Sequence, residues 1–336
     1  MGNFIDLPNI NPETLILENE PTTKKAKNST FDEKNYLNIR LAEGEEEKTI
    51  VIRLLPMDLK TGNPFVKIHV HNVQVPKEMV QPGQKPFKSY ICLRKTEDID
   101  HERFGKKCPF CDINYQAYQD FLKETDPIKK EDLKKLSIAN KEDEAVIVRC
   151  IERGKENEGV KFWKFNIRND KTDPYNQIIK LFNLRKEAAA KKGKVENILD
   201  IYEGKDLVVT ITNGTSAPTI TDDSERSPLS DNAEQMKAWI FDTKKWQDVF
   251  TCKTYEYLKL VSELRVPWFD KANNVWVDKK EFDAVKNEKS EKAAEANKAI
   301  EEAKAAIVQE PTAAQVEKEN FIDSITDKDE EDGLPF

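Results

Sequence analysis

Segments in which apolar and polar positions alternate recur through the first two thirds of the chain, and each predicts a β-strand. The stretch YLNIRLAEGEEEKTIVIRLLP, residues 36–56, alternates on both sides of a polar turn and predicts a hairpin. In PFVKIHVHNVQV, residues 64–75, Val66, Ile68 and Val70 share one side and predict the core face. The opposite side carries Phe65, Lys67, His69 and His71.

Residues 112–142 carry a helical pattern interrupted by a turn at Asp126-Pro127. AVIVRCIE (145–152) and VKFWKFNI (160–167) predict a second hairpin, and DLVVTITNG predicts a further strand after a helix that ends at Gly193. Short strands interspersed with helices indicate an α+β protein, and a partly open β-barrel of the OB-like type is one compact solution.

The pattern also divides the chain into parts. Residues 1–34 are polar and predict an N-terminal arm, and residues 35–270 carry the strands and most helices of the core. Residues 271–310, rich in Ala, Glu and Lys, predict a solvated helical spacer. Residues 311–336 are acidic and predict a disordered tail.

Charge changes this picture in one respect. The net charge of −8 argues against a nucleic-acid binder, but the excess of acidic residues lies entirely from Asp283 onwards. Residues 145–194 carry 13 basic residues against 6 acidic ones, so the body of the protein is locally basic. No long apolar run or signal peptide is evident, which predicts an intracellular protein.

Cysteine and histidine cluster in one part of the chain. Cys108 and Cys111 form a Cys-x-x-Cys pair, which suits either a redox dithiol or half of a metal site. The polar segment before the pair, DIDHERFGKK, is unlike the strand that precedes a thioredoxin-type motif. Cys92, with His69, His71 or His101, can complete a metal site, whereas Cys150 and Cys252 are predicted core residues.

Four stretches in this order resemble one family: TIVIRLLP (49–56), PFVKIHVH (64–71), the cysteine cluster, and AVIVRCIERGKENEGVKFWKF (145–165). The family is the zinc-containing single-stranded DNA-binding proteins of T-even-like tailed bacteriophages. The resemblance implies an OB-like core and a zinc-binding subdomain at about residues 69–125. It implies His71, Cys92, Cys108 and Cys111 as ligands, although the segment between His71 and Cys92 is longer than the family's.

The resemblance also implies a cationic cleft for single-stranded DNA, lined by cations for phosphates and rings for bases. Arg53 stands at the family's arginine position, and the alternative for the aromatic residues is that Trp163 and Phe165 are core while Phe162 faces outward. Tyr90, Tyr115 and Tyr118 are further stacking candidates. The predicted contacts are Arg53, Arg149, Arg153, Lys161, Trp163, Lys164, Phe165, Arg168 and Tyr175.

Both ends of the chain suggest partners. The basic run KKAKNST, with Lys25, Lys27 and Ser29, loosely matches the family's self-association motif, or is a solvated basic patch. The last residues, DEEDGLPF, resemble the tip of bacterial single-stranded DNA-binding proteins and would dock on replication and recombination enzymes. The tip residues are Asp329, Glu330, Glu331, Asp332, Leu334, Pro335 and Phe336.

The resulting prediction is a non-enzymatic protein that coats single-stranded DNA in the cytoplasm of the bacterial host. Two alternatives from other classes are a glutaredoxin-like oxidoreductase using Cys108 and a zinc-ribbon factor that binds duplex DNA.

Overall fold

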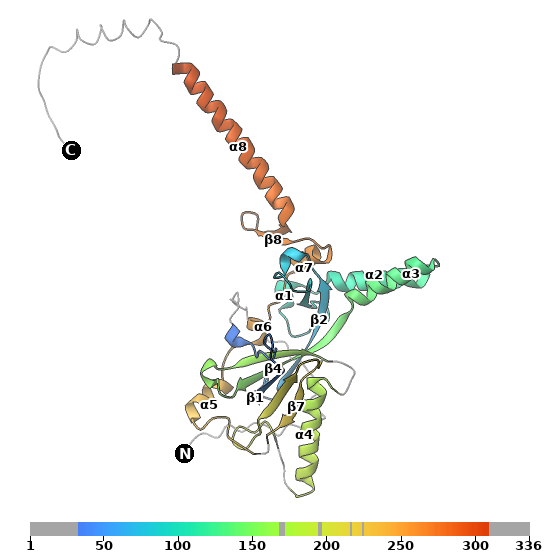
Figure 1. Ribbon diagram of the computed structural model, residues 1–336, viewed down its shortest axis with the longest axis vertical. Coiled ribbons are helices and arrows are strands. Elements are labelled where there is room, and N and C mark those ends of the chain that lie inside the picture. Colours follow the sequence, from blue (N-terminus) through green and yellow to red (C-terminus); the bar gives the residue numbers. More distant parts are fainter. Residues whose placement is uncertain (1–32, 168–171, 194–196, 216, 224, 309–336) are drawn as a thin grey trace, which may run out of the picture. The chain divides into compact units, whose positions relative to one another are not determined.

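The computed structural model of the chain (Figure 1) describes residues 33–167, 172–193, 197–215, 217–223 and 225–308. The chain divides into two compact units, Met1–Pro267 and Trp268–Phe336. The N-terminal arm before residue 33, Arg168, and the tail after residue 308 lie outside the described residues.

The first unit is built on one seven-stranded sheet in which every strand pair is antiparallel. Its main path runs β3-β2-β4-β1-β6-β7, and β5 pairs with β4. The strands are β1 (Glu47–Leu55), β2 (Phe65–Gln74), β3 (Phe87–Ile91), β4 (Glu142–Glu152), β5 (Lys161–Asn166), β6 (Leu207–Thr212) and β7 (Thr219–Asp222).

Strand β4 organises this sheet because it pairs with three others. Residues 142–148 of β4 pair with β2, and residues 149–152 pair with β1. Residues 145–150 of β4 also pair with β5. The path ends at β3 and β7, and among the described residues these two strands do not pair with each other. In the part of the chain that the structure describes, the sheet is therefore not a closed barrel, and the α+β class and the antiparallel strands are confirmed. The OB-like type of the partly open barrel stays a prediction.

Both faces of the sheet carry a hydrophobic core. On one face Ile68, Ile147 and Phe162 belong to a core that includes Trp239 and Leu258 from helices. On the other face the core contains Ile52, Val148 and Trp163 together with residues of the helix at 174–190. A strand buried on two faces is apolar at consecutive positions, as AVIVRCI in β4 shows.

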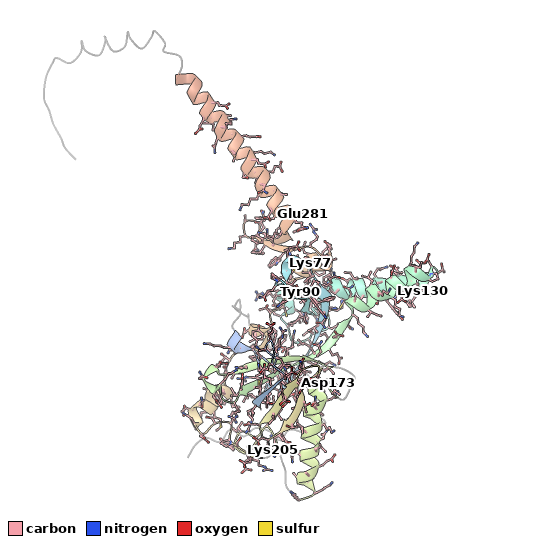
Figure 2. All side chains as sticks on the ribbon, viewed as in Figure 1. Lys77, Tyr90, Lys130, Asp173, Lys205 and Glu281 are labelled. Atoms are coloured by element: carbon pink, nitrogen blue, oxygen red, sulfur yellow. The ribbon has the colours of Figure 1, made fainter. Side chains whose placement is uncertain are left out.

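Two long helices, α2 (Pro109–Lys123) and α3 (Pro127–Asn140), lie side by side as an antiparallel pair (Figure 1). Each begins with proline at its first position, and the Asp126 carboxylate caps α3 by accepting from the Ile128 and Lys129 amides. The Asn114 side chain donates to the backbone and side chain of Ser137 and so joins the two helices. Lys130 marks the end of the pair that points away from the sheet (Figure 2).

The other helices of this unit cover the sheet. Helix α4 packs Ile178 and Phe182 onto one face. The shorter helices contribute Met236, Trp246 and Val261 to the other core. These helices are α1 (His101–Phe104), α4 (Pro174–Ala190), α5 (Ala233–Ile240), α6 (Trp246–Val249) and α7 (Tyr255–Ser262).

The second unit contains the hairpin of β8 (Pro267–Asp270) and β9 (Val275–Asp278), followed by α8 (Lys279–Val308). The rings of Phe269 and Trp276 lie 5.1 Å apart between centroids and join the two strands. Within the spacer predicted at 271–310, a helix is confirmed at Lys279–Val308, with ion pairs one turn apart such as Lys279–Asp283, whereas Val275–Asp278 forms a strand. Among the described residues, no helix combines the length and the apolar composition needed to cross a bilayer.

The sequence-based elements match the structure unevenly. The strands near residues 64–75, 145–152, 160–167 and 206–214 and the helices within 112–142 are confirmed. The hairpin predicted at 36–56 is wrong, since only Glu47–Leu55 is a strand. Tyr36 forms a single bridge with Phe162, and the Leu37 amide donates to the Phe162 carbonyl, so this segment follows β5 instead of pairing with β1.

Candidate metal centre

Four possible metal ligands converge from three segments of the first unit. His71 lies on β2, Cys92 follows the last residue of β3, and Cys108 and Cys111 lie at the start of α2. Their ligand atoms all lie within 4.8 Å of one another, and all four residues are buried. Residues that are up to 40 positions apart in the chain, as are His71 and Cys111, therefore meet at one point.

Local structure explains how each ligand reaches this point. His71 pairs with Tyr90 across β2 and β3, and the Cys92 amide donates to the His69 carbonyl over 2.8 Å, which brings Cys92 beside the histidine strand. Cys108 is the N-cap residue of α2 with extended backbone, and Pro109 begins the helix. The next cysteine, Cys111, lies in the first turn, so both thiols face the same side.

The distances suit a single ion between the four residues. The Cys92 and Cys111 sulfurs lie 3.4 Å apart. His71 Nε2 lies 3.4 Å from the Cys108 sulfur and 3.5 Å from the Cys111 sulfur. With Zn–S bonds of about 2.3 Å, the edges of a tetrahedron measure about 3.5–3.8 Å, close to these separations.

The second nitrogen of His71 has its own partner. His71 Nδ1 lies 2.9 Å from the backbone carbonyl oxygen of Asn140, the last residue of α3. A carbonyl can only accept, so Nδ1 carries a proton, and Nε2 is the nitrogen that faces the thiols and is available to a metal ion. Such an outer hydrogen bond is the usual support of a metal-binding histidine.

The thiols and the imidazole influence one another's protonation. Burial lowers the pKa of His71, but the neighbouring Cys108 and Cys92 groups outweigh this effect and raise its pKa to about 10. Hydrogen bonds from Cys111 and Cys92 lower the pKa of the Cys108 thiol against the effect of burial. The same neighbours, Cys108 and Cys92, together with burial raise the pKa of Cys111, so without an ion Cys108 is the thiolate of this pair. A metal ion binds thiolates and neutral imidazole, so its binding would release protons from the cluster.

The donor set therefore fits a metal ion, and three thiols with one imidazole are consistent with zinc. The other two histidines lie outside the cluster. His69 is half-buried on β2, and the half-buried His101 places its Nδ1 3.2 Å from the Gly105 carbonyl oxygen. Cys150 and Cys252 are buried core residues, as predicted.

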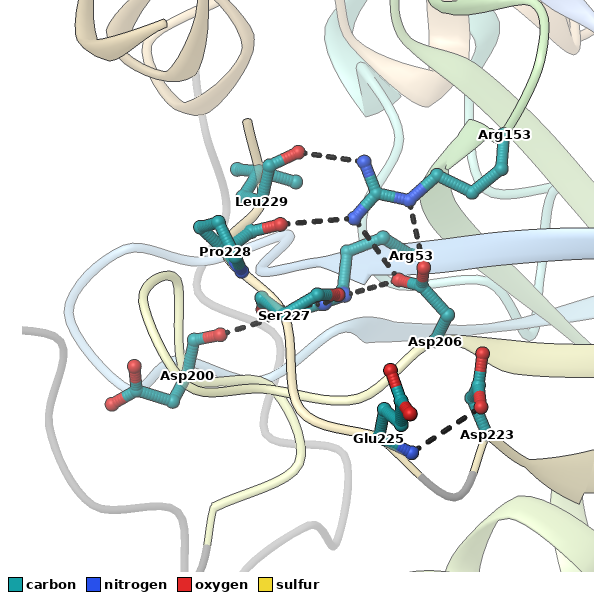
Figure 3. A network of polar contacts seen from close by, with 9 residues as sticks. All are labelled: Arg53, Arg153, Asp200, Asp206, Asp223, Glu225, Ser227, Pro228 and Leu229. Carbon is teal, nitrogen blue, oxygen red and sulfur yellow. Dashed lines mark hydrogen bonds and ion pairs between the residues drawn. The ribbon is translucent and has the colours of Figure 1, made fainter. Parts of the chain in front are cut away.

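Arg53 and Arg153, predicted to contact DNA, instead form an internal network around Asp206 (Figure 3). The Arg53 side chain is 1% exposed, and its Nε lies 2.6 Å from the Asp206 carboxylate. Its other nitrogens donate to the Asp200 carbonyl and to Ser227. The prediction that Arg53 is a surface contact is wrong, because the guanidinium joins β1 to loops that come from residues 200–229.

Gly204 lies directly beside this network. A Cβ atom at this position would lie 2.4 Å from Arg53 Nη1 and 2.2 Å from the Asp200 carbonyl oxygen. Only glycine leaves room for the guanidinium here.

Two other predicted cations also face inward. Arg149 is 4% exposed and donates to the carbonyls of Trp239, Ile240 and Asp242 at the end of α5. Lys161 is 3% exposed and forms ion pairs with Glu152 and Glu158. Both were predicted to contact phosphates. That prediction is wrong, because Arg149 is hydrogen-bonded to backbone carbonyls and Lys161 is ion-paired with carboxylates of the chain itself.

The predicted stacking rings are buried as well. Trp163 and Phe165 are 2% and 8% exposed and contact each other with centroids 4.6 Å apart. Phe162, the alternative outward residue, is also buried, because β5 has a core on each face. Tyr175 is half-buried with its ring edge against Phe65.

The remaining candidates differ in exposure. Tyr90 is buried against Phe110, whereas Tyr115 and Tyr118 are exposed on α2. Lys164 is half-buried, and its Nζ lies 3.4 Å from the Ser89 hydroxyl. Arg168, the basic run near Lys25 and the acidic tip from Asp329 to Phe336 lie outside the described residues.

Sequence reasoning missed Asn140 and Asp206. Asn140 contributes only its backbone carbonyl, which no residue type reveals, and Asp206 is one acidic residue among 62. Compared with known proteins, the chain matches no protein-family model and no curated protein.

Proposed function

We propose that this protein binds single-stranded DNA without strong sequence preference and coats it during phage DNA replication, recombination and repair in the host cytoplasm. In this proposal zinc, held by His71, Cys92, Cys108 and Cys111, has a structural role. Bound there, zinc would cross-link β2, the end of β3 and the start of α2, with no coordination position left for a substrate. The protein would catalyse no reaction.

The observation that carries the proposal is the convergence of these four residues at one buried point. They are the same four residues that the resemblance to the phage family implies, and they come from segments separated by a long loop and a helix. The His71–Asn140 hydrogen bond adds the support that a histidine ligand requires.

The burial of the thiols favours a structural metal over the glutaredoxin-like alternative. Thiol–disulfide exchange needs a sulfur that a second protein can reach. Cys108 is 0% and Cys111 5% exposed, and Cys92 lies against them. A zinc-ribbon factor for duplex DNA remains a separate outcome of the binding experiment.

The acidic tip extends the proposal to partners. We infer that residues 329–332 and 334–336 dock on replication and recombination enzymes, with Phe336 offering an aromatic ring beside the acidic residues. The same acidic residues would compete with DNA for cationic sites at low salt. Self-association along DNA through Lys25, Lys27 and Ser29 belongs to the same proposal.

A gel-shift comparison of single-stranded and duplex DNA of equal length tests the function. We expect tighter binding to the single strand, an affinity that falls as salt rises, and tighter low-salt binding after deletion of residues 323–336. Metal analysis of the purified protein should find one zinc per chain. Equal affinity for both forms of DNA would contradict the proposal and favour the duplex-binding alternative.

A further inference from the structure

Three lysines from separate elements lie around the end strand β3. Lys88 is exposed on β3, Lys164 is half-buried on β5, and Lys253 is half-buried just before α7. We call these three residues the basic site. Lys164 Nζ lies 3.4 Å from the hydroxyl of Ser89, the residue after Lys88. Burial lowers the pKa of Lys253, and Lys88 lowers it further. Because side chains alternate along a strand, Lys88 faces the opposite side of β3 from Ser89, so cations flank this strand on both sides.

Aromatic rings hold the two half-buried ammonium groups. Lys164 Nζ lies 5.5 Å from the centroid of the Phe250 ring, and Lys253 Nζ lies 5.3 Å from that of Tyr257. Tyr257 in turn contacts Tyr90 of β3, which is labelled in Figure 2, with centroids 6.0 Å apart. The rings therefore keep both cations in place beside the strand that carries Lys88.

The basic site lacks the anion that balances other buried cations in this protein. Lys161, three residues before Lys164 on the same strand, pairs with Glu152 and Glu158. Among the described residues, no carboxylate pairs with Lys164 or Lys253. Burial lowers the pKa of both lysines, and Lys88 lowers that of Lys253 further. An external anion would relieve this unbalanced charge.

The surroundings indicate which anion fits. Strand β3 is the end strand of the sheet, and within the described part of the chain its outer edge pairs with no other strand. Phe87, at the start of β3, is 58% exposed and lies on the same side of the strand as Ser89. The matching ligand is an extended polymer that carries both phosphates and flat bases. Its phosphates would pair with the lysines, and one of its bases would stack on the exposed ring at the strand edge.

We propose that Lys88, Lys164 and Lys253 hold backbone phosphates of single-stranded DNA along the outer edge of β3, while Phe87 stacks on a base. This inference rests on the proposed function and gives it a location. It replaces the stripe that the sequence predicted, of which Lys164 alone among the described residues remains in the site. Paired bases in duplex DNA are not available to stack on Phe87, so the site favours single strands.

Salt-dependent binding of labelled oligo-dT tests the site. The variants are Lys88→Gln, Lys253→Gln, Lys164→Gln and Phe87→Leu. The matched control is Lys180→Gln, which removes an exposed lysine from α4, the helix that covers the opposite face of the sheet. Fluorescence anisotropy at several salt concentrations measures the slope of log K against log salt.

Each glutamine variant in the basic site should reduce the steepness of this slope by about 0.7, because one phosphate contact is lost. The Lys88→Gln, Lys253→Gln double variant should reduce it by about 1.4. Phe87→Leu should weaken binding roughly fivefold or more with an unchanged slope, since it removes stacking but no charge. Lys180→Gln should behave as the wild-type protein does.

The outcomes separate this site from the general function. If the wild-type protein binds single-stranded DNA and the variants Lys88→Gln, Lys253→Gln and Lys180→Gln all bind it equally well, the basic site is overturned. The proposal that the protein binds single-stranded DNA is then still intact. If the variants change the slope of log K against log salt equally for a duplex of the same length, the assignment of the basic site to single strands is overturned. A wild-type protein that binds no single-stranded DNA overturns both proposals. Lys88 is exposed, so its variant still decides the result if Lys164→Gln fails to fold.

Discussion

Replacing Arg53 with methionine tests whether this arginine is a structural residue or a DNA contact. Methionine has a similar length and can fill the space, so the substitution removes mainly the charge and its hydrogen bonds. Arg53 is 1% exposed, ion-paired with Asp206 at 2.6 Å, and donates to three further oxygens on Asp200 and Ser227. Breaking a buried ion pair typically costs about 3–5 kcal/mol.

The lower end of that range applies here, because Asp206 keeps a second partner. Arg153 Nε and Nη2 lie 2.9 and 3.1 Å from the Asp206 carboxylate oxygens, so the carboxylate is not left alone. We therefore expect a loss of about 3 kcal/mol in the free energy of unfolding. For a unit of this size, that loss corresponds to a fall in Tm of roughly 6–12 °C.

Urea denaturation followed by circular dichroism measures the effect. Arg185→Met is the matched control: its side chain is 38% exposed and pairs with Asp222, so it should cost less than about 1 kcal/mol. The reasoning is refuted if the free energy of unfolding of Arg53→Met lies within about 0.5 kcal/mol of the wild-type value. A loss of DNA affinity without a loss of stability would restore Arg53 as a contact residue.

The remaining predictions concern the metal centre and the glycine beside Arg53. A strong chelator should remove one zinc per chain and lower Tm, and Cys92→Ser should reproduce both effects, whereas the control Cys252→Ser should keep its zinc. A Cys92→Ser protein with full zinc content and unchanged Tm would contradict the assigned ligand set. Gly204→Ala should cost about 1–3 kcal/mol in urea denaturation, because its Cβ would displace Arg53 and the Asp200 carbonyl. A variant as stable as the wild-type protein would show that this close approach is absent in solution.

Local patterns were good guides to elements and to the metal ligands. Apolar patterns bounded by turns predicted β2, β4, β5 and β6, and the Asp126-Pro127 turn predicted the boundary between α2 and α3. The four residues His71, Cys92, Cys108 and Cys111 were identified through their chemistry and a family resemblance, and the structure brings them together. The choice among three histidines, however, needed the register of β2 against β3.

The predicted DNA contacts show where local patterns stop being informative. Arg149, Lys161 and Trp163 look like a basic, aromatic stripe in the sequence, yet each is buried. Alternation can show which residues share a face of a strand, but it cannot show that both faces are covered. In β5 both are covered, by separate cores, so charge and aromaticity there serve packing.

The sequence alone determined the residue chemistry and the short-range order: thiols at helix-start spacing, strands from alternation, a long solvated helix and an acidic end. Tertiary structure alone decided which cations find an internal carboxylate and which do not. Arg53 meets Asp206, 153 positions away, whereas Lys164 and Lys253 lie over the rings of Phe250 and Tyr257. Electrostatic balance depends on distances in space, and a linear order of residues does not contain those distances.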